Sequence, residues 1–269
     1  MAPVIERIAE LRLDTMRSLG LLTRLHVSSR WFAGFDGRFD RSARAFPIVG
    51  ALLGALVAAV AVAATLAGLP RLAAAVLATV VGIVTTGGLH EDGLADSADA
   101  LGGRDRVRRL AIMRDSAIGS YGVLALLLAV GLKVTLLGAL LGDAVAAALA
   151  LVAASAGARA AMVWLWAATP PARTDGAAAG SGHPTMRSAR TAAVLAALIA
   201  MPALAWLGPW RMLVAVALVV IVVVALRGWA VRALGGHTGD VLGACVILVE
   251  GAILLGLATG GAGADMLAR

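Results

Sequence analysis

The sequence predicts an all-α fold: a polytopic membrane helix bundle of about seven transmembrane helices, with an N-terminal amphipathic interfacial helix. Hydrophobic residues make up 61% of the 269 residues and the mean hydropathy is +0.92, whereas soluble domains are roughly 45–50% apolar. Charged residues are only 14% and gather in a few clusters. Between the clusters lie apolar runs of about 20 residues, the length that crosses the hydrocarbon core of a bilayer.

Each expected span is bounded by proline, glycine or charged residues. The spans are 47–68, 71–89, 119–141, 144–168, 191–208, 211–227 and 241–260. The division between the fifth and sixth spans is the least sharply marked. Gly50 and Gly54 form a GxxxG pair in the first span, which favours helix packing over a functional role.

The chain is expected to divide into an N-terminal segment, residues 1–46, and a transmembrane helical catalytic domain, residues 47–269. Within the first segment, apolar residues of 4–22 recur at helical spacing between acids and arginines, the pattern of a helix lying on the membrane surface. Residues 28–44 are rich in Gly, Arg and Phe, and we expect a loop there that could cover a cytoplasmic site.

The basic residues predict the sidedness of the bundle. With the N-terminus in the cytoplasm, the same side receives residues 1–46, 90–118, 169–190 and 227–240. These segments contain 18 of the 23 Lys and Arg residues, as the positive-inside rule predicts. We therefore expect a multi-pass protein of the cell membrane, surrounded by lipid, with its active site facing the cytoplasm. Because the basic residues are spread over several loops, we expect no nucleic-acid partner.

The densest run of charge and glycine occupies residues 87–122. It begins with Glu91, Asp92, Asp96 and Asp99. In a helix the three aspartates share one face, where like charges repel unless a cation lies between them. Clustered carboxylates without matching histidines or cysteines favour hard cations, so we expect Mg²⁺, with Mn²⁺ as the alternative.

Arginines accompany these acids at positions 104, 106, 108, 109 and 114. Anion and cation binders side by side suit a metal–phosphate substrate, which makes Arg104 and Arg108 candidate phosphate ligands. Bound Mg²⁺ keeps positions open for phosphate oxygens, so the pattern favours phosphoryl or phosphodiester transfer. His90-Glu91 does not begin an HExxH motif, because Leu94 occupies the second histidine position. The alternative is a solvated acidic loop at a helix end.

A second polar segment, residues 234–243, precedes the last span on the same expected side. It supplies His237, Thr238 and Asp240, although Asp240 could simply cap the helix that follows.

Three ionisable residues, Lys133, Arg159 and Glu250, fall within apolar spans. A charge at that depth costs about 3 kcal/mol, so each should face the bundle interior and have a partner. For Lys133 a structural ion pair and a functional role are equally favoured, whereas the other two lean towards function.

Several ordered segments together resemble one known family. They are residues 22–24 (LTR), 46–50 (FPIVG), 87–99 (GGLHEDGLADSAD), 112–122 (IMRDSAIGSYG), Ser155 with Arg159, and 235–243 (GGHTGDVLG) with Glu250. They span most of the chain, and by them it closely resembles the cobalamin synthase family, the adenosylcobinamide-GDP ribazoletransferases. The central and C-terminal segments are long and therefore specific, whereas the N-terminal ones are short.

The resemblance implies a Mg²⁺-dependent phosphotransferase. The 3′-hydroxyl of α-ribazole 5′-phosphate, or of α-ribazole, would attack the cobinamide-linked phosphorus of adenosylcobinamide-GDP. The products would be adenosylcobalamin 5′-phosphate, or adenosylcobalamin, and GMP. Asp92, Asp96 and Asp99 would hold Mg²⁺, and Glu91 or Asp115 would aid a second ion or take the proton of the nucleophile.

The resemblance also implies the residues that contact substrate. The expected contacts are His90, Arg104, Arg108, Arg159, His237 and Asp240. A homo-oligomer and an association with other enzymes of corrinoid synthesis are both compatible with this family.

Two rival functions come from other classes of membrane protein. A CDP-alcohol phosphotransferase of lipid synthesis also uses a DG…D…D run, but Asp92-Gly93 is not followed by the Ala-Arg and the widely spaced second pair of those enzymes. An ion-coupled transporter would use the buried charges to bind its ion. No P-loop, dinucleotide fingerprint or GxSxG motif is present, which argues against an ATP-driven pump, a Rossmann oxidoreductase and a serine hydrolase.

Overall fold

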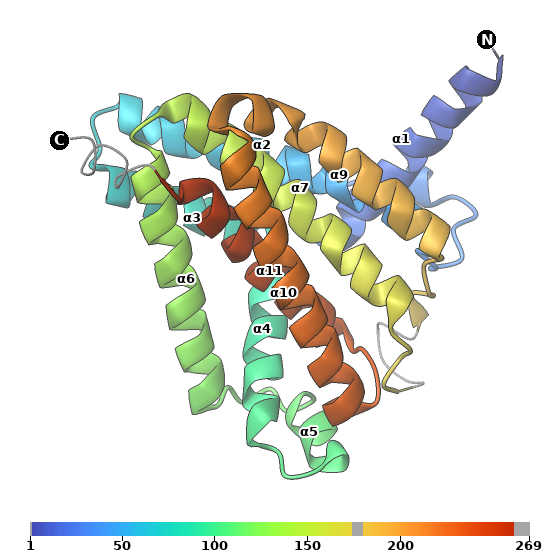
Figure 1. Cartoon of the computed structure of the whole chain (residues 1–269). Helices are drawn as coiled ribbons and strands as arrows, with labels where there is room; N and C mark the ends of the chain where they lie inside the picture. The colour runs from blue at the N-terminus through green and yellow to red at the C-terminus, as the bar shows by residue number, and fades with distance from the viewer. Residues whose placement is uncertain (1, 174–179, 261–269) are drawn as a thin grey trace.

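The computed structural model describes residues 2–173 and 180–260, and the secondary structure of these residues is helical, as the sequence predicts (Figure 1). The α-helices are α1 (Ala2–Leu22), α2 (Phe46–Leu66), α3 (Arg71–Thr86), α4 (Leu89–Asp99), α5 (Arg106–Ile112), α6 (Ser120–Leu140), α7 (Ala144–Ala168), α9 (Met186–Leu207), α10 (Pro209–Leu234) and α11 (Gly239–Ala258). Short 3₁₀ helices are η1 (Ser29–Phe32), η2 (Ser42–Ala45) and η3 (Ala100–Gly102).

Six helices of the described residues are long and apolar enough to cross a membrane, which confirms a polytopic bundle. They are α2 together with η2, α6, α7, α9, α10 and α11. The count rises to seven only if α3 and the residues of α4 and η3 are taken as one span bent by 90°.

The expected continuous span 71–89 is therefore wrong. Helix α3 ends at Thr86, and its 16 residues measure only about 24 Å at 1.5 Å per residue, less than the hydrocarbon core. Gly87 and Gly88 follow with φ angles of 68° and 70°, a left-handed conformation that glycine adopts without strain. These two residues turn the chain, so the acidic run begins a new helix.

The division between the fifth and sixth expected spans is confirmed. Helix α9 ends at Leu207, Gly208 has a φ angle of 90°, and Pro209 opens α10, in the first-turn position that proline favours. Helix α10 continues to Leu234, beyond the expected end at residue 227, because a helix does not need to stop where its apolar run meets charged residues.

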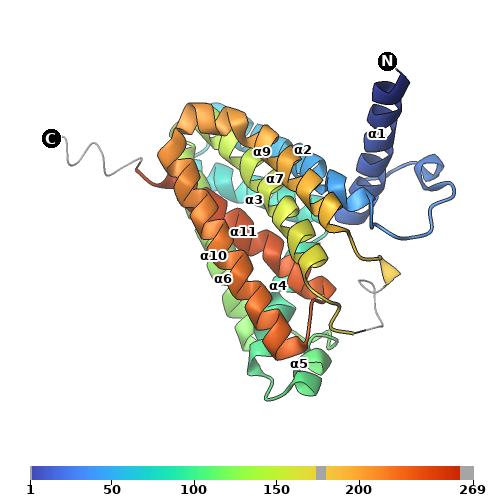
Figure 2. The ribbon, with the colours of Figure 1, turned by 45° about the vertical axis from the view of Figure 1, so that its right-hand side comes forward.

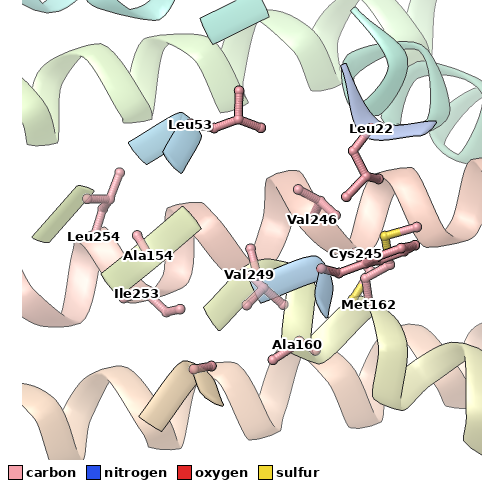
Figure 3. Packing of buried hydrophobic residues seen from close by; sticks show 14 of the residues in the cluster. Leu22, Leu53, Ala154, Ala160, Met162, Cys245, Val246, Val249, Ile253 and Leu254 are labelled. Carbon is pink, nitrogen blue, oxygen red and sulfur yellow. The ribbon is translucent and has the colours of Figure 1, made fainter. Parts of the chain in front are cut away.

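The centre of the bundle is formed by α7 and α11, the most buried of the candidate spans. Figure 3 shows Ala160 and Met162 of α7 beside Cys245 and Val249 of α11, within the buried apolar cluster. Helix α2 packs against α7 through its glycines: a Cβ atom added to Gly54 would lie 2.6 Å from the Leu151 carbonyl oxygen. The expected packing role of the GxxxG pair is thus confirmed.

Helix α1 forms as the spacing predicts, and its N-terminal half stands apart from the bundle (Figure 2). Its C-terminal half is held by Asp14, which is buried and accepts hydrogen bonds from Ser42 Oγ at 3.1 Å and from Arg44 Nε at 2.7 Å. The loop 28–44 therefore packs on α1, and through the Asp40 carbonyl it also accepts a hydrogen bond from Ser188 Oγ. The placement of α1 at a membrane surface stays a prediction.

The four segments expected on the cytoplasmic side meet at one end of the molecule. Hydrogen bonds join Phe39 N to Ser181 O, Arg106 Nε to Leu234 O, and His237 N to Pro170 O. At the other end, Trp206 Nε1 donates to Asp143 Oδ2 at 2.9 Å. The chain therefore has one end rich in polar segments and one end with short connections, as the sidedness argument requires.

The three ionisable residues inside the spans are partners of one another, as their cost in the membrane predicts. Glu250 of α11 accepts from Lys133 Nζ of α6 at 2.7 Å and from Arg159 Nη1 of α7 at 3.0 Å. Arg159 also donates to Ser155 Oγ at 3.0 Å. One carboxylate therefore joins three helices and is shared by two cations, of which Arg159 is buried and Lys133 is partly buried.

Replacing Glu250 with Gln should destabilise the bundle, because Lys133 and Arg159 would lose their anionic partner. Breaking such a pair costs about 3 kcal/mol, so thermal unfolding in detergent should show a clearly lower Tm. The exposed Glu6→Gln is the matched control. Adding Lys133→Met to Glu250→Gln should recover part of the loss, since it removes one unpaired cation. An unchanged Tm for Glu250→Gln would contradict a stabilising role for the network.

Candidate active site

Helix α4 presents the acidic run in helical form, as expected. Asp92, Asp96 and Asp99 occupy positions i, i+4 and i+7 of α4, and Asp99 is the last residue of the helix. Their side chains therefore lie on one face of α4. Asp92 is exposed, Asp96 is half-buried and Asp99 is buried. The shared face is confirmed, but the three carboxylates differ in their access to solvent.

A contact between glycines sets the position of α4. A Cβ atom added to Gly93 would lie 2.7 Å from the Asp240 carbonyl oxygen and 3.1 Å from the Gly243 Cα atom. Only hydrogen fits there, so α4 and the start of α11 touch through their backbones. The contact brings the first turn of α11 beside the acidic face, where burial and then repulsion by Asp240 raise the pKa of the Asp96 carboxyl to about 7.

Asp92, Asp96 and Asp240 form what we call the acidic cluster. Asp96 is repelled by both of the other carboxylates, and Asp240 Oδ2 is buried without a hydrogen-bond partner. Arg173 Nη2 lies 3.6 Å from Asp240 Oδ2, which is too far for a hydrogen bond. The negative charge of the cluster exceeds the charge of this one guanidinium, so the cluster favours binding of a further cation.

Asp99 is directed to the start of α6. Its Oδ2 accepts from Gly119 N at 2.7 Å and its Oδ1 from Gly122 N at 2.8 Å. These amides belong to the N-terminus of α6, where unpaired donors and the helix dipole stabilise a carboxylate. The residue expected as the third metal ligand thus holds the glycine-rich turn before α6 against α4.

His90 and Glu91 point into the bundle. His90 is 2% exposed, and its Nε2 is buried with no hydrogen-bond partner. The Oε2 of Glu91 is likewise buried and unpartnered. The charges of the Lys133–Glu250–Arg159 network act on both residues. The first turn of α4 therefore links the acidic cluster to this network, and Arg159, an expected substrate contact, is already engaged inside it.

His237 clamps two loops of the polar end. Its backbone pairs with residues 170–172, and its Nδ1 lies 2.8 Å from the Thr169 carbonyl oxygen. Burial holds the pKa of the His237 imidazole below its ordinary value. The cap of α11 is Thr238, whose Oγ1 accepts from Val241 N at 3.3 Å. Asp240 is therefore not needed as a cap, and its carboxylate is available to the acidic cluster.

The remaining expected residues lie on or beside α5, next to the end of α4 in Figure 1. Arg104, Arg108 and Asp115 are exposed. The backbone of Arg108 bonds the capping side chain of Asp105, and Asp115 accepts from Ala117 N in a turn. Within the described residues, no hydrogen bond or ion pair joins these three side chains to the acidic cluster. On these contacts they are not part of the acidic cluster.

The acidic cluster offers only carboxylate oxygens to a metal ion. In the part of the chain that the structure describes, no three His, Cys, Asp or Glu side chains lie close enough together to hold a metal ion by themselves. An open set of hard donors with one orphaned buried oxygen, Asp240 Oδ2, suits Mg²⁺, which keeps water and takes phosphate oxygens as further ligands. A magnesium ion at these carboxylates would need phosphate oxygens or water for its remaining ligands.

Sequence reasoning missed Arg173. It lies in the stretch TPPARTDG, far from the acidic run, and neither its spacing nor its composition distinguishes it from other basic loop residues. Its position in a loop expected on the cytoplasmic side, the same side as Asp240, is the one feature of the sequence that could have indicated it.

Comparisons with known proteins identify relatives over nearly the whole chain. Three similar proteins are each named adenosylcobinamide-GDP ribazoletransferase. The one from Sinorhizobium sp is 41% identical over 251 residues, covering 91% of this chain and 95% of the relative. The one from Rhizobium etli is 40% identical over 259 residues, 94% and 99% of the two chains. The one from Azorhizobium caulinodans is 46% identical over 223 residues, 81% and 83%.

No solved structure matches the chain. The sequence model of the family described as Cobalamin-5-phosphate synthase matches residues 14–258. This range includes α4, the acidic cluster, the ion pairs of Glu250 and the loop contacts of His237. The chain therefore belongs to the Cobalamin-5-phosphate synthase family.

Proposed function

We propose that this protein is an adenosylcobinamide-GDP ribazoletransferase, which joins adenosylcobinamide-GDP to α-ribazole 5′-phosphate or to α-ribazole. The 3′-hydroxyl of the ribazole attacks the cobinamide-linked phosphorus, the bond from that phosphorus to GMP breaks, and GMP leaves with the electron pair. The product is adenosylcobalamin 5′-phosphate or adenosylcobalamin. Both the family and the names of the relatives support this assignment.

The observation that carries the proposal is the acidic cluster at the glycine contact of α4 and α11. Two helices distant in sequence meet so that carboxylates repel one another at the polar end. Such an arrangement costs stability unless a cation binds. A diphosphate substrate that arrives with a divalent cation offsets this cost. The repulsion does not stabilise the fold, so a purely structural role does not account for it.

Asp92, Asp96 and Asp240 would hold Mg²⁺, or Mn²⁺ as the alternative. When bound, the ion would offset negative charge on the diphosphate and on the departing GMP. Asp99 differs from the other carboxylates because both of its oxygens already accept backbone hydrogen bonds. We therefore assign Asp99 a positioning role: it fixes the turn before α6 relative to α4.

The proton of the attacking hydroxyl needs an acceptor near the acidic cluster. Glu91 is one residue from Asp92 and has an unpartnered oxygen, whereas Asp115 is exposed and bonded within its own turn. Glu91 has the unpartnered oxygen but points into the bundle, so Glu91 and Asp115 both stay candidates for the base. Arg104 and Arg108 keep their proposed role as phosphate contacts, since their side chains are exposed and follow the acidic run closely in the sequence.

The polar end is proposed to face the cytoplasm. It gathers most of the basic residues together with the acidic cluster, and the positive-inside rule puts such an end on the cytoplasmic side of the cell membrane. Both water-soluble substrates would then meet the cluster without crossing the bilayer.

The assignment predicts that membranes containing this protein convert adenosylcobinamide-GDP, α-ribazole 5′-phosphate and Mg²⁺ into the joined corrinoid and an equal amount of GMP. Chromatography of both products gives the measurement, and chelation of the metal should stop the reaction. Folded, membrane-inserted protein that yields no joined corrinoid would contradict the function. A lipid product would instead indicate a phosphotransferase of lipid synthesis.

Asp96→Asn should leave the protein folded but lower turnover by about 100-fold or more, because charge stabilisation worth several kcal/mol depends on the cluster. The control is Asp36→Asn, which changes an exposed aspartate whose carboxylate bonds only a nearby backbone amide. Initial rates of GMP release at saturating Mg²⁺ measure the effect. Near-normal rates for Asp96→Asn would rule out a metal role for this carboxylate.

A further inference from the structure

Arg173 is held in place by contacts of its own segment. The backbone of residues 170–172 pairs with that of His237, at 2.8 Å for both hydrogen bonds. Arg106 Nη2 adds a hydrogen bond to the Ala172 carbonyl at 2.6 Å, and Arg106 Nε bonds the Leu234 carbonyl at 2.7 Å. Ala172, the residue before Arg173, is thus held by hydrogen bonds to both His237 and Arg106. These bonds hold the backbone from which the Arg173 side chain reaches the acidic cluster.

The pair that Arg173 makes with Asp240 is incomplete. Their closest atoms are 3.6 Å apart, beyond the range of a charge-assisted hydrogen bond. Arg173 Nη1 and Asp240 Oδ2 are both buried and have no hydrogen-bond partner. Both groups therefore keep unused bonding capacity, at the cost that unpaired buried polar atoms carry. This cost is recovered if each group meets a better partner.

We propose that Arg173 is a displaceable counter-ion of Asp240 that becomes a phosphate contact when substrate binds. This role rests on the proposed function and follows from the charges at the cluster. A divalent cation at the acidic cluster satisfies Asp240, which releases the guanidinium. The diphosphate carried by the same cation offers Arg173 oxygens that it can bind with two hydrogen bonds.

The charge argument distinguishes Arg173 from the other arginines of this end. Arg104 and Arg108 have no contact with the acidic cluster in the described residues, and Arg159 is paired inside the bundle. Arg173 is in contact with a carboxylate of the cluster, so its position depends directly on whether a cation is bound. Substrate phosphate and metal are thereby coupled through one side chain.

The test separates metal binding from substrate binding. In Arg173→Ala, Mn²⁺ titrated against the detergent-solubilised protein and followed by electron paramagnetic resonance should bind at least about threefold more tightly, because a competing cation is removed. The KM for adenosylcobinamide-GDP should rise by about 10-fold or more, because a charged phosphate contact is lost. Arg173→Lys should fall between Arg173→Ala and the unchanged protein in both measurements.

The matched control is Arg190→Ala, which removes an exposed arginine of α9 and should change neither quantity. Weaker or unchanged Mn²⁺ binding in Arg173→Ala would overturn the proposal, as would an unchanged KM. A loss of both affinities would mean that Arg173 only supports its loop. Tighter Mn²⁺ binding in Arg173→Ala, in a protein that never releases GMP, would overturn the proposed function yet support Arg173 as the counter-ion.

Discussion

The close approach of α4 and α11 is the constraint on which the candidate site depends. The helices touch where Gly93 faces Asp240 and Gly243, with no room for another side chain at Gly93. The approach is possible because Gly87 and Gly88 first turn the chain by 90° out of α3. The close contact between the backbones of the two helices thus sets the positions of the carboxylates.

Charge is then distributed on two sides of α4. On the face of α4 that lies away from the bundle interior, the acidic cluster carries excess negative charge, with Arg173 as a distant partner. Towards the inside, His90 and Glu91 face the network in which Glu250 binds Lys133 and Arg159. The inner network joins three spans through one shared carboxylate, so it fixes the scaffold. The outer cluster is unbalanced, so it is suited to a ligand that brings positive charge.

Much of this arrangement follows from sequence, and the failures have physical causes. Apolar runs and helical spacing identify the bundle, α1 and the shared face of the aspartates, because these depend on local periodicity. The span 71–89 failed because hydropathy does not register the two left-handed glycines that end α3. The hydrogen bonds of Asp99 were not predicted, because its partners, the amides of Gly119 and Gly122, come from the start of another helix. Arg173 depends on a loop pairing that no periodicity reveals.

The central claim is that the α4–α11 contact assembles the cation site, and Mn²⁺ affinity in a glycine variant measures it most directly. Gly93→Ala places a methyl group against the Asp240 backbone, whereas Gly131→Ala on α6 meets nothing within 4 Å. Electron paramagnetic resonance titration should show Mn²⁺ affinity at least about 10-fold lower in Gly93→Ala, because Asp240 moves away from Asp96. Gly131→Ala should bind Mn²⁺ as the unchanged protein does. Equal Mn²⁺ affinity in folded Gly93→Ala would contradict the account.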